Sequence, residues 1–431
     1  MAAERPPLTR GGLVLAPSVG LAHGLHYAYN VAMAAVLGPA AFGALGALLA
    51  LILLGSVPGI ALQAMAARHT ALLARDRPAQ RALWRSLLRL AAWWGAALAA
   101  VTVADSPVLG TWLHLDSPVP VLALALALAP STFSYTSQGM LQGREAFGGF
   151  VVVGLVNAVA KLGAGLGLVA AGFGVSGAVA GAAVGTALGA ATGVLWVRRS
   201  IVAAPTAAEV PASGAPAAGA LGREATVAVT GLLGLFLLTN LDVPLARHFL
   251  AAEASGLYAL GAVVAKIAFW GPQFVTTLVF ARLVTGGDRR RLLAGSAALI
   301  VASGALLAVG LASLAALGVA LPLLGRDYAA IGRALPLFAV LGCSLALVQL
   351  LLFEEIAASA RRMGRVLALA AMLQAALISV AFHDSVGEIV GTALAVALAL
   401  VAVGGVLASR RGDPLSARPR AGPGAPSPPA T

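Results

Sequence analysis

Charged side chains are scarce in this sequence. Asp, Glu, Lys and Arg make up 10% of its 431 residues, whereas hydrophobic types make up 60%. Soluble globular proteins carry about 25% charged residues, so a fold that exposes its whole surface to water is excluded. Runs of about 20 apolar residues, the length that crosses the hydrocarbon core of a bilayer, recur throughout the chain. The sequence therefore predicts an all-α, polytopic membrane protein.

Cysteine is almost absent as well. Cys343 is the single thiol, which excludes intramolecular disulfides and metal clusters held by several thiolates. Four of the six histidines lie near the ends of apolar segments, without further ligands at the spacing of a metal site; they are His69, His114, His248 and His383. We expect no metal site and no cofactor.

Lysine is rare among the basic residues. Lys161 and Lys266 are the two lysines among 28 Lys+Arg, and both lie inside apolar segments, where an ammonium group is costly and usually functional. The arginines instead lie mostly between the apolar segments. The two basic residue types therefore have different tasks in this chain.

The apolar segments predict about twelve transmembrane helices. They cover residues 12–36, 42–66, 88–110, 118–141, 149–171, 174–197, 225–249, 256–281, 292–318, 334–356, 364–383 and 388–408. With both termini in the cytoplasm, 23 of the 26 arginines fall on the cytoplasmic side, as the positive-inside rule requires. The net charge of +12 is thus a topology signal in a cell-membrane protein, and nucleic-acid binding has little support.

The chain divides into two halves with similar sequence landmarks. Residues 1–200 are predicted to form an N-terminal six-helix lobe, 201–222 a cytoplasmic linker, 223–411 a C-terminal six-helix lobe and 412–431 a disordered cytoplasmic tail. Leu37–Arg68 aligns with Leu250–Arg282, and this alignment matches Gly43 with Gly256. Because six spans is an even number, the repeats are parallel and an axis along the membrane normal relates them.

A glycine ladder occupies the sixth span. Glycine recurs at every fourth position from Gly177 to Gly193, a spacing that lets membrane helices approach closely. We interpret this span as a buried packing helix of the first lobe.

Polar residues follow stripes within four spans, and a helix surrounded by lipid does not carry such stripes. The stripes predict a polar central cavity, although hydrogen bonding between helices without a cavity also explains them. The candidate cavity residues are His26 and Asn30 on the first span, Tyr135 and Gln138 on the fourth, Asn157 and Lys161 on the fifth, and Lys266 and Gln273 on the eighth.

Asp242 is the one acid well inside an apolar segment. The turn after the seventh span is centred near residue 252, so Asp242 and Lys266 lie at similar depths and can pair across the hairpin at about 1.5 Å per residue. A structural ion pair and a role in coupling transport to H+ or Na+ both remain open.

Three stretches carry a resemblance to a known family. They are LGPAAFGALGALLALILLGSVPGIALQAMAAR, MLQGREAFGGFVVVGLVNAVAKLGAGLGLVAAGFGVSGAVAGAAVG and TNLDVPLARHFLAAEASGLYALGAV. They resemble the polysaccharide-transporter branch of the multidrug/oligosaccharidyl-lipid/polysaccharide (MOP) exporter superfamily. The resemblance implies two six-helix lobes around a central cavity, alternating access, and export or flipping of a lipid-linked oligosaccharide. It also implies a functional basic residue at Lys161.

Three functions are compatible with these features. The leading one is a flippase or exporter whose partner is a polyprenyl-(pyro)phosphate-linked glycan or a similar anionic lipid. A cation-coupled multidrug antiporter of the same fold is the alternative, but it would favour acidic cavity residues. A membrane-embedded glycosyltransferase or polymerase would need a large outer loop with catalytic residues, and the longest outer loop has about eight to ten residues. We therefore expect a transporter, with no catalytic residues.

Overall fold

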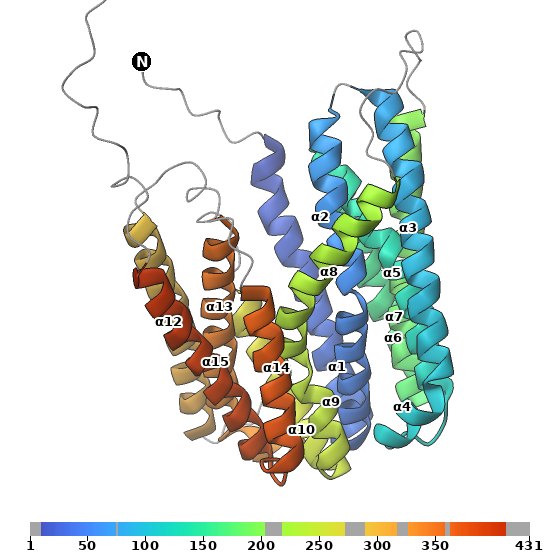
Figure 1. The fold of residues 1–431 in the computed structure, drawn as a ribbon. Helices are drawn as coiled ribbons and strands as arrows, with labels where there is room; N and C mark the ends of the chain where they lie inside the picture. The colour runs from blue at the N-terminus through green and yellow to red at the C-terminus, as the bar shows by residue number, and fades with distance from the viewer. Residues whose placement is uncertain are drawn as a thin grey trace, which may run out of the picture.

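The computed structural model describes residues 10–74, 76–202, 218–271, 289–316, 326–357 and 363–410. Within these ranges the chain is helical and has no strand (Figure 1). The first lobe consists of α1 (Arg10–Gly55), α2 (Val57–Leu72), α3 (Arg77–Ala104), α4 (Ser106–Trp112), α5 (Val119–Gly143), α6 (Phe147–Leu168) and α7 (Gly174–Val202). The second lobe consists of α8 (Ala218–Asn240), α9 (Asp242–Phe249), α10 (Ala252–Trp270), α12 (Arg289–Ala316), α13 (Leu335–Ala357), α14 (Met363–Val380) and α15 (Val386–Arg410).

The described residues contain twelve spans. Nine helical segments are long and apolar enough to cross a membrane, and two of them, Gly20–Leu72 and Phe147–Ser200, have 53 and 54 residues. Each of these two holds two spans, because glycines with positive φ interrupt the helix at Gly38 and at Gly172. The shorter apolar helix Gly364–Val380 supplies the twelfth span. The predicted all-α fold is confirmed.

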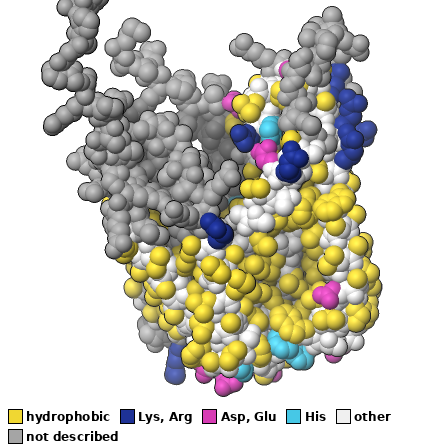
Figure 2. All heavy atoms as spheres, in the orientation of Figure 1, with side chains coloured by type: hydrophobic (Ala, Val, Ile, Leu, Met, Phe, Trp, Pro, Cys, Tyr) yellow, Lys and Arg dark blue, Asp and Glu magenta, His cyan; other side chains and the backbone are white. Residues whose placement is uncertain are grey.

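Apolar side chains dominate much of the visible surface below its upper part (Figure 2). We call the end of the bundle where α2 ends and α3 begins the basic end, since it carries Arg68, Arg77 and Arg144. The end that carries α4 and the last turn of α9 is called the opposite end.

Helix α3 is longer than the sequence predicts. It begins at Arg77 instead of residue 88, because Asp76 caps it: its Oδ1 accepts a hydrogen bond from the Ala79 amide at 2.8 Å. Leu83 and Leu87 then bury one face of the added turns, so the arginine-rich segment is helical and not a loop. Helix α8 likewise begins at Ala218, inside the segment 201–222 predicted as a linker.

The predicted seventh span is broken in the middle. Helix α8 ends at Asn240 and α9 begins at Asp242. Pro244 lies in the first turn of α9, where its missing amide hydrogen is tolerated. The break gives the span two segments, and the polar residues Asn240 and Asp242 flank it.

Two matched residue pairs of the repeats lie at one interface between the lobes. A Cβ added at Gly43 would overlap the side chain of Ser255 and the amide of Gly256, and one added at Gly256 would overlap the carbonyl of Pro39. Gly46 similarly lies against Ala259, its counterpart in the alignment. Matched residues in contact indicate that a pseudo-two-fold axis passes between α1 and α10, as parallel repeats require.

Alanine at Gly256 should destabilise this interface. Its Cβ has no room beside the Pro39 backbone, so the helices must separate, at a cost of about 1–3 kcal/mol. Gly391→Ala is the matched control, because a Cβ there meets nothing within 4 Å. Thermal unfolding of the purified protein should show a lower Tm for the first variant alone. Equal Tm values for both variants would contradict this account of the interface.

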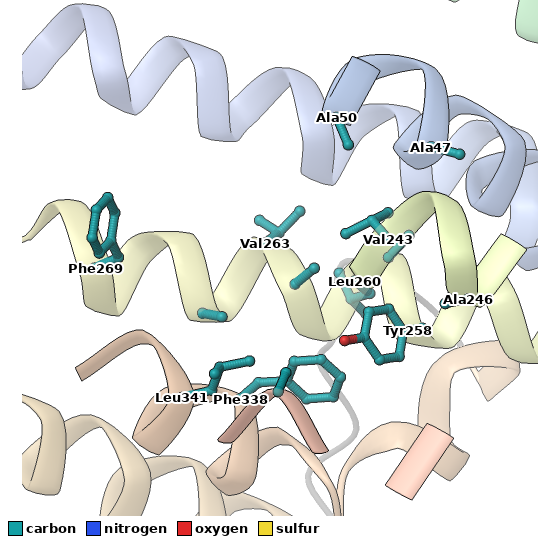
Figure 3. Close-up of a cluster of buried hydrophobic side chains, with 14 of the residues drawn as sticks. Ala47, Ala50, Val243, Ala246, Tyr258, Leu260, Val263, Phe269, Phe338 and Leu341 are labelled. Atoms are coloured by element: carbon teal, nitrogen blue, oxygen red, sulfur yellow. The ribbon is translucent and has the colours of Figure 1, made fainter. Parts of the chain in front are cut away.

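A large hydrophobic core joins α1, α9, α10 and α13 (Figure 3). Tyr258 and Phe338 form its centre, with ring centroids 5.1 Å apart in an edge-to-face arrangement. A second core lies at the basic end of the first lobe, and it includes Leu221 and Ala225 from the first turns of α8. Helix α8 therefore packs against the first lobe at the basic end.

Candidate substrate site between the lobes

Lys161 lies on α6 above an aromatic ring of α1. Its Nζ is 4.2 Å from the ring centroid of Tyr29, a cation–π contact. The ring is fully buried, and its hydroxyl donates a hydrogen bond to the Ala178 carbonyl at 2.7 Å. Gly165 leaves space for the ring, because a Cβ there would lie 2.7 Å from Cε2 of Tyr29. Tyr29 is thus a fixed platform beneath the ammonium group.

The glycine ladder of α7 determines where α6 lies. A Cβ at Gly181 would overlap the backbone of Gly165, and one at Gly185 would lie 2.7 Å from the Asn157 carbonyl and 2.8 Å from Cβ of Lys161. The two helices therefore pack backbone to backbone, as the ladder predicts. This close packing fixes the position of the segment that carries Asn157 and Lys161.

Basic side chains from both lobes converge near Lys161. Lys266 on α10 lies within electrostatic range of Lys161, as does His26 on α1. Tyr27 links the lobes here, since its hydroxyl donates to the Lys266 carbonyl at 3.2 Å. His23 stacks on Trp270 with ring centroids 6.1 Å apart. The predicted residues His26, Lys161 and Lys266 thus lie in one region beside α1, and we call it the cationic cluster because of its two ammonium groups.

Asp242 has a different partner from the predicted one. Its Oδ2 accepts a hydrogen bond from the Tyr258 hydroxyl at 2.6 Å, and among the described residues it forms no ion pair with Lys266 within 4.0 Å. Lys266 remains within electrostatic range. Oδ1 of Asp242 is buried and has no side-chain partner, and the backbone amides of Asp242 and Val243 lie beside the carboxyl group. The functional role of Asp242 stays a prediction.

The remaining candidates form bonds within the first lobe. Asn30 donates to the His26 carbonyl at 2.8 Å, and Gln138 donates to the Ser134 hydroxyl at 3.4 Å. Ser134 and Asn157 both lie against Gly189 of α7, and Tyr135 lies against Gly59 of α2. Gln273 lies outside the described residues. Asn30 therefore borders the cationic cluster, whereas Tyr135 and Gln138 belong to the packing of α5.

Two residues of the site were not predicted from the sequence. Tyr29 and Tyr258 both lie in apolar helices and both make buried hydroxyl hydrogen bonds. A buried tyrosine hydroxyl needs a partner, and the chain has only five tyrosines. This scarcity was the available signal for both residues.

An arginine closes the opposite end between the lobes. Arg247 of α9 is only 8% exposed, and its guanidinium donates to the carbonyls of Leu113 at 2.9 Å, His114 at 3.1 Å and Ala40 at 3.3 Å. It also donates to the Ser255 hydroxyl at 3.2 Å. The carbonyls of residues 113 and 114 follow α4, so α9 of the second lobe caps a helix of the first. We call these contacts the Arg247 latch.

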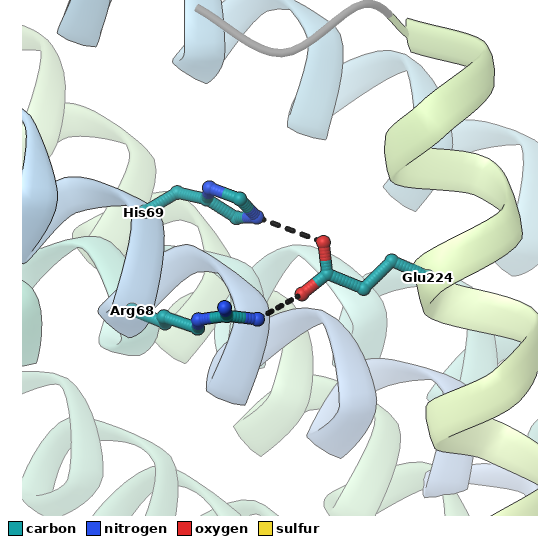
Figure 4. Close-up of polar contacts among 3 residues, drawn as sticks. All are labelled: Arg68, His69 and Glu224. Atoms are coloured by element: carbon teal, nitrogen blue, oxygen red, sulfur yellow. Dashed lines mark hydrogen bonds and ion pairs between the residues drawn. The ribbon is translucent and has the colours of Figure 1, made fainter.

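Aromatic contacts extend the latch. His248 stacks on Trp112 with ring centroids 4.9 Å apart, and its Nδ1 lies 2.9 Å from the Trp112 carbonyl. Phe249 lies against His383 at 4.6 Å between ring centroids. At the basic end the same broken span contacts the first lobe again, because Glu224 of α8 accepts from Arg68 at 3.1 Å and from His69 at 2.9 Å (Figure 4). The α8–α9 span therefore contacts the first lobe at both ends.

Known proteins resemble this chain in structure. No family model and no curated protein matches its sequence. The lipid II flippase MurJ, in an inward closed conformation, superposes with a TM-score of 0.72 at 12% identity, over 93% of this chain and 88% of that one. An inward-facing MATE family multidrug resistance transporter of the MOP superfamily gives a TM-score of 0.64 at 13% identity, over 89% and 94%. This is the MOP exporter fold.

A third structure with the MOP fold is a transporter from Pyrococcus furiosus, with a TM-score of 0.53 at 13% identity over 92% of this chain and 95% of that one. The report on that protein concludes that the reverse polarity of its binding pocket suggests a different function. These likenesses show the fold. The charge of the site in this chain therefore has to be inferred from the chain's own residues.

Proposed function

We propose that this chain transports an anionic lipid, a polyprenyl-(pyro)phosphate-linked glycan or a close chemical relative, across the cell membrane by alternating access. The observation that carries the proposal is the cationic cluster, in which Lys161 of the first lobe and Lys266 of the second lie within electrostatic range of each other. A (pyro)phosphate headgroup must cross about 30 Å of hydrocarbon. Cations between the lobes replace part of the water that the headgroup loses.

The charges at the site favour an anionic substrate over a cationic drug. The buried acid near the cluster, Asp242, is 5% exposed and already accepts a hydrogen bond from Tyr258. A drug cation would instead meet two ammonium groups. Asp242 supports a second element of the proposal, coupling to H+ or Na+, since it is a buried acid within electrostatic range of Lys266. A cation-coupled multidrug antiporter therefore stays the alternative.

Alternating access requires the lobes to separate at each end in turn. The Arg247 latch holds the opposite end closed, and we propose that the basic end faces the cytoplasm because of its arginines. The substrate would then enter from the cytoplasmic leaflet and leave after the latch opens. Both termini are cytoplasmic in this scheme.

Ligand-induced stabilisation tests the substrate class. A ligand that binds the folded state stabilises it by about 2.7 kcal/mol at a hundredfold excess over Kd, and so raises the Tm. We expect a polyprenyl-pyrophosphate-linked saccharide to raise the Tm of the purified protein, and tetraphenylphosphonium, a lipophilic cation, to leave it unchanged. The uncharged polyprenol controls for the lipid tail. Stabilisation by the cation and not by the pyrophosphate lipid would favour the antiporter.

A further inference from the structure

Helix α3 carries a row of arginines that the transport proposal does not use. Arginine occupies every fourth position from Arg77 to Arg89, and Trp93 follows at the same spacing. We call Arg77, Arg81, Arg85 and Arg89 the arginine stripe. Three of the four are exposed, with Arg81 partly covered, and Trp93 is 62% exposed. The stripe and the tryptophan thus lie on the outer surface of the first lobe.

Packing fixes the direction in which the stripe faces. Leu83, Leu87 and Ala91 on the other side of α3 are fully buried in the second core. The helix cannot rotate to bury its arginines without exposing these side chains. Figure 2 shows basic side chains gathered in a column at the upper right, over the region where Figure 1 places α3.

The length of α3 places the start of the stripe at the level of the lipid headgroups and Arg89 about one helical turn inside the hydrocarbon boundary. Its 28 residues measure about 42 Å at 1.5 Å per residue, whereas the hydrocarbon core is about 30 Å thick. The excess lies at the basic end, because the arginines occupy the first half of the helix and the second half is apolar. Exposed tryptophan next to such a region is typical of the boundary between headgroups and hydrocarbon.

The helix that carries the stripe supplies no acidic residue to it. Helix α3 contains no Asp or Glu, and Asp76 before it caps the helix. Arg77 donates to the Ser200 carbonyl at 3.1 Å, and Nε of Arg89 donates to the Arg85 carbonyl at 3.4 Å. Neither Arg85 nor Arg89 forms an ion pair with a carboxylate in the described part of the chain. Their terminal guanidinium nitrogens therefore face the surroundings of the protein.

We propose that Arg85 and Arg89 of the arginine stripe bind the phosphate groups of anionic phospholipids in the leaflet at the basic end. A guanidinium matches a phosphate with two parallel hydrogen bonds, and the long side chains reach toward the headgroups while their stems cover apolar surface. Arg85 and Arg89, nearest to Trp93, make the deepest contacts. The binding fixes the height of the first lobe in the bilayer and is separate from transport of the substrate.

Lipid binding to the full-length protein tests the proposal. Native mass spectrometry measures the affinity for phosphatidylglycerol relative to phosphatidylcholine with the same acyl chains. Each basic residue at an anionic membrane surface contributes roughly a fivefold gain in affinity, so R85Q/R89Q should reduce the preference for phosphatidylglycerol about tenfold or more. R85K/R89K should lose less, because it keeps the charges but not the paired hydrogen bonds.

A control variant tests whether the loss of lipid preference is specific to the arginine stripe or follows the removal of any exposed arginine. R333Q removes an exposed arginine at the opposite end of the bundle and should keep the preference. The preference of the unmodified protein should also weaken in 0.5 M ammonium acetate, which shortens the screening length. No preference in the unmodified protein, or a loss in R333Q equal to that in R85Q/R89Q, would overturn the proposal.

Discussion

Lys161→Ala should abolish transport while the protein still inserts and folds. The substitution removes the ammonium above Tyr29, and loss of one partner of a desolvated charge pair costs about 2–5 kcal/mol. That range corresponds to a loss of about thirtyfold or more in transport rate, if the pair forms during headgroup passage. The loss is measured as the transport rate of the reconstituted protein, and thermal unfolding checks that the variant is folded.

Two further variants at this position isolate the charge. Lys161→Met keeps most of the side-chain volume without the ammonium and should be as inactive as Lys161→Ala. Lys161→Arg should keep part of the activity, because a planar guanidinium keeps the charge but not the compact shape. The exposed Arg333 of the opposite end is the control, and Arg333→Ala should transport normally. Normal transport by Lys161→Met would exclude a role for the charge.

Arg247→Ala should open the opposite end of the molecule. It leaves the carbonyls of Leu113, His114 and Ala40 without the donor they have now, and hydrogen bonds to a charged group contribute about 1.5–3 kcal/mol each. Because these bonds join the lobes, their loss should lower the stability of the closed arrangement relative to an open one. Arg247→Lys should be intermediate, since one ammonium cannot reach all of these acceptors.

A distance measurement across the latch tests this result. Spin labels at Val108 of α4 and at Asp384, between α14 and α15, report on the two lobes at the opposite end, and both side chains are exposed. Cys343 is the single native thiol, so Cys343→Ser provides a background for labelling. We expect one short distance in the parent and a second, longer population with Arg247→Ala. An unchanged single distance would show that Arg247 does not hold the lobes together.

The helical architecture could be predicted from composition, because apolar length alone determines which segments cross a bilayer. The matched glycines Gly43 and Gly256 also predicted the repeats correctly, since close helix approach demands small residues. The extended start of α3 was missed because its arginines suggested a loop, although Asp76 and Pro78 form a helix start signal. The start of α3 is therefore encoded in its local sequence.

The sequence alone could not predict which residues contact each other across the two lobes. Similar depth in the membrane predicts that Asp242 lies near Lys266, but depth does not show which neighbour donates to the carboxylate, and Tyr258 occupies that position. Periodicity likewise assigns Lys161 to a polar face without showing that Tyr29 of another helix lies under it. The Arg247 latch likewise requires that the carbonyls after α4 lie beside Arg247, and the sequence does not show this. Such contacts follow from the packing of whole helices.

Headgroup translocation in proteoliposomes tests the central claim most directly. A fluorescent polyprenyl-pyrophosphate-linked saccharide is incorporated in both leaflets, and an impermeant reagent then quenches the outer-leaflet headgroups. We expect the unmodified protein to make nearly all of the label accessible, and vesicles with Lys161→Met to leave the inner-leaflet half protected. Protection with both proteins, together with active efflux of a lipophilic cation by the unmodified one, would contradict it.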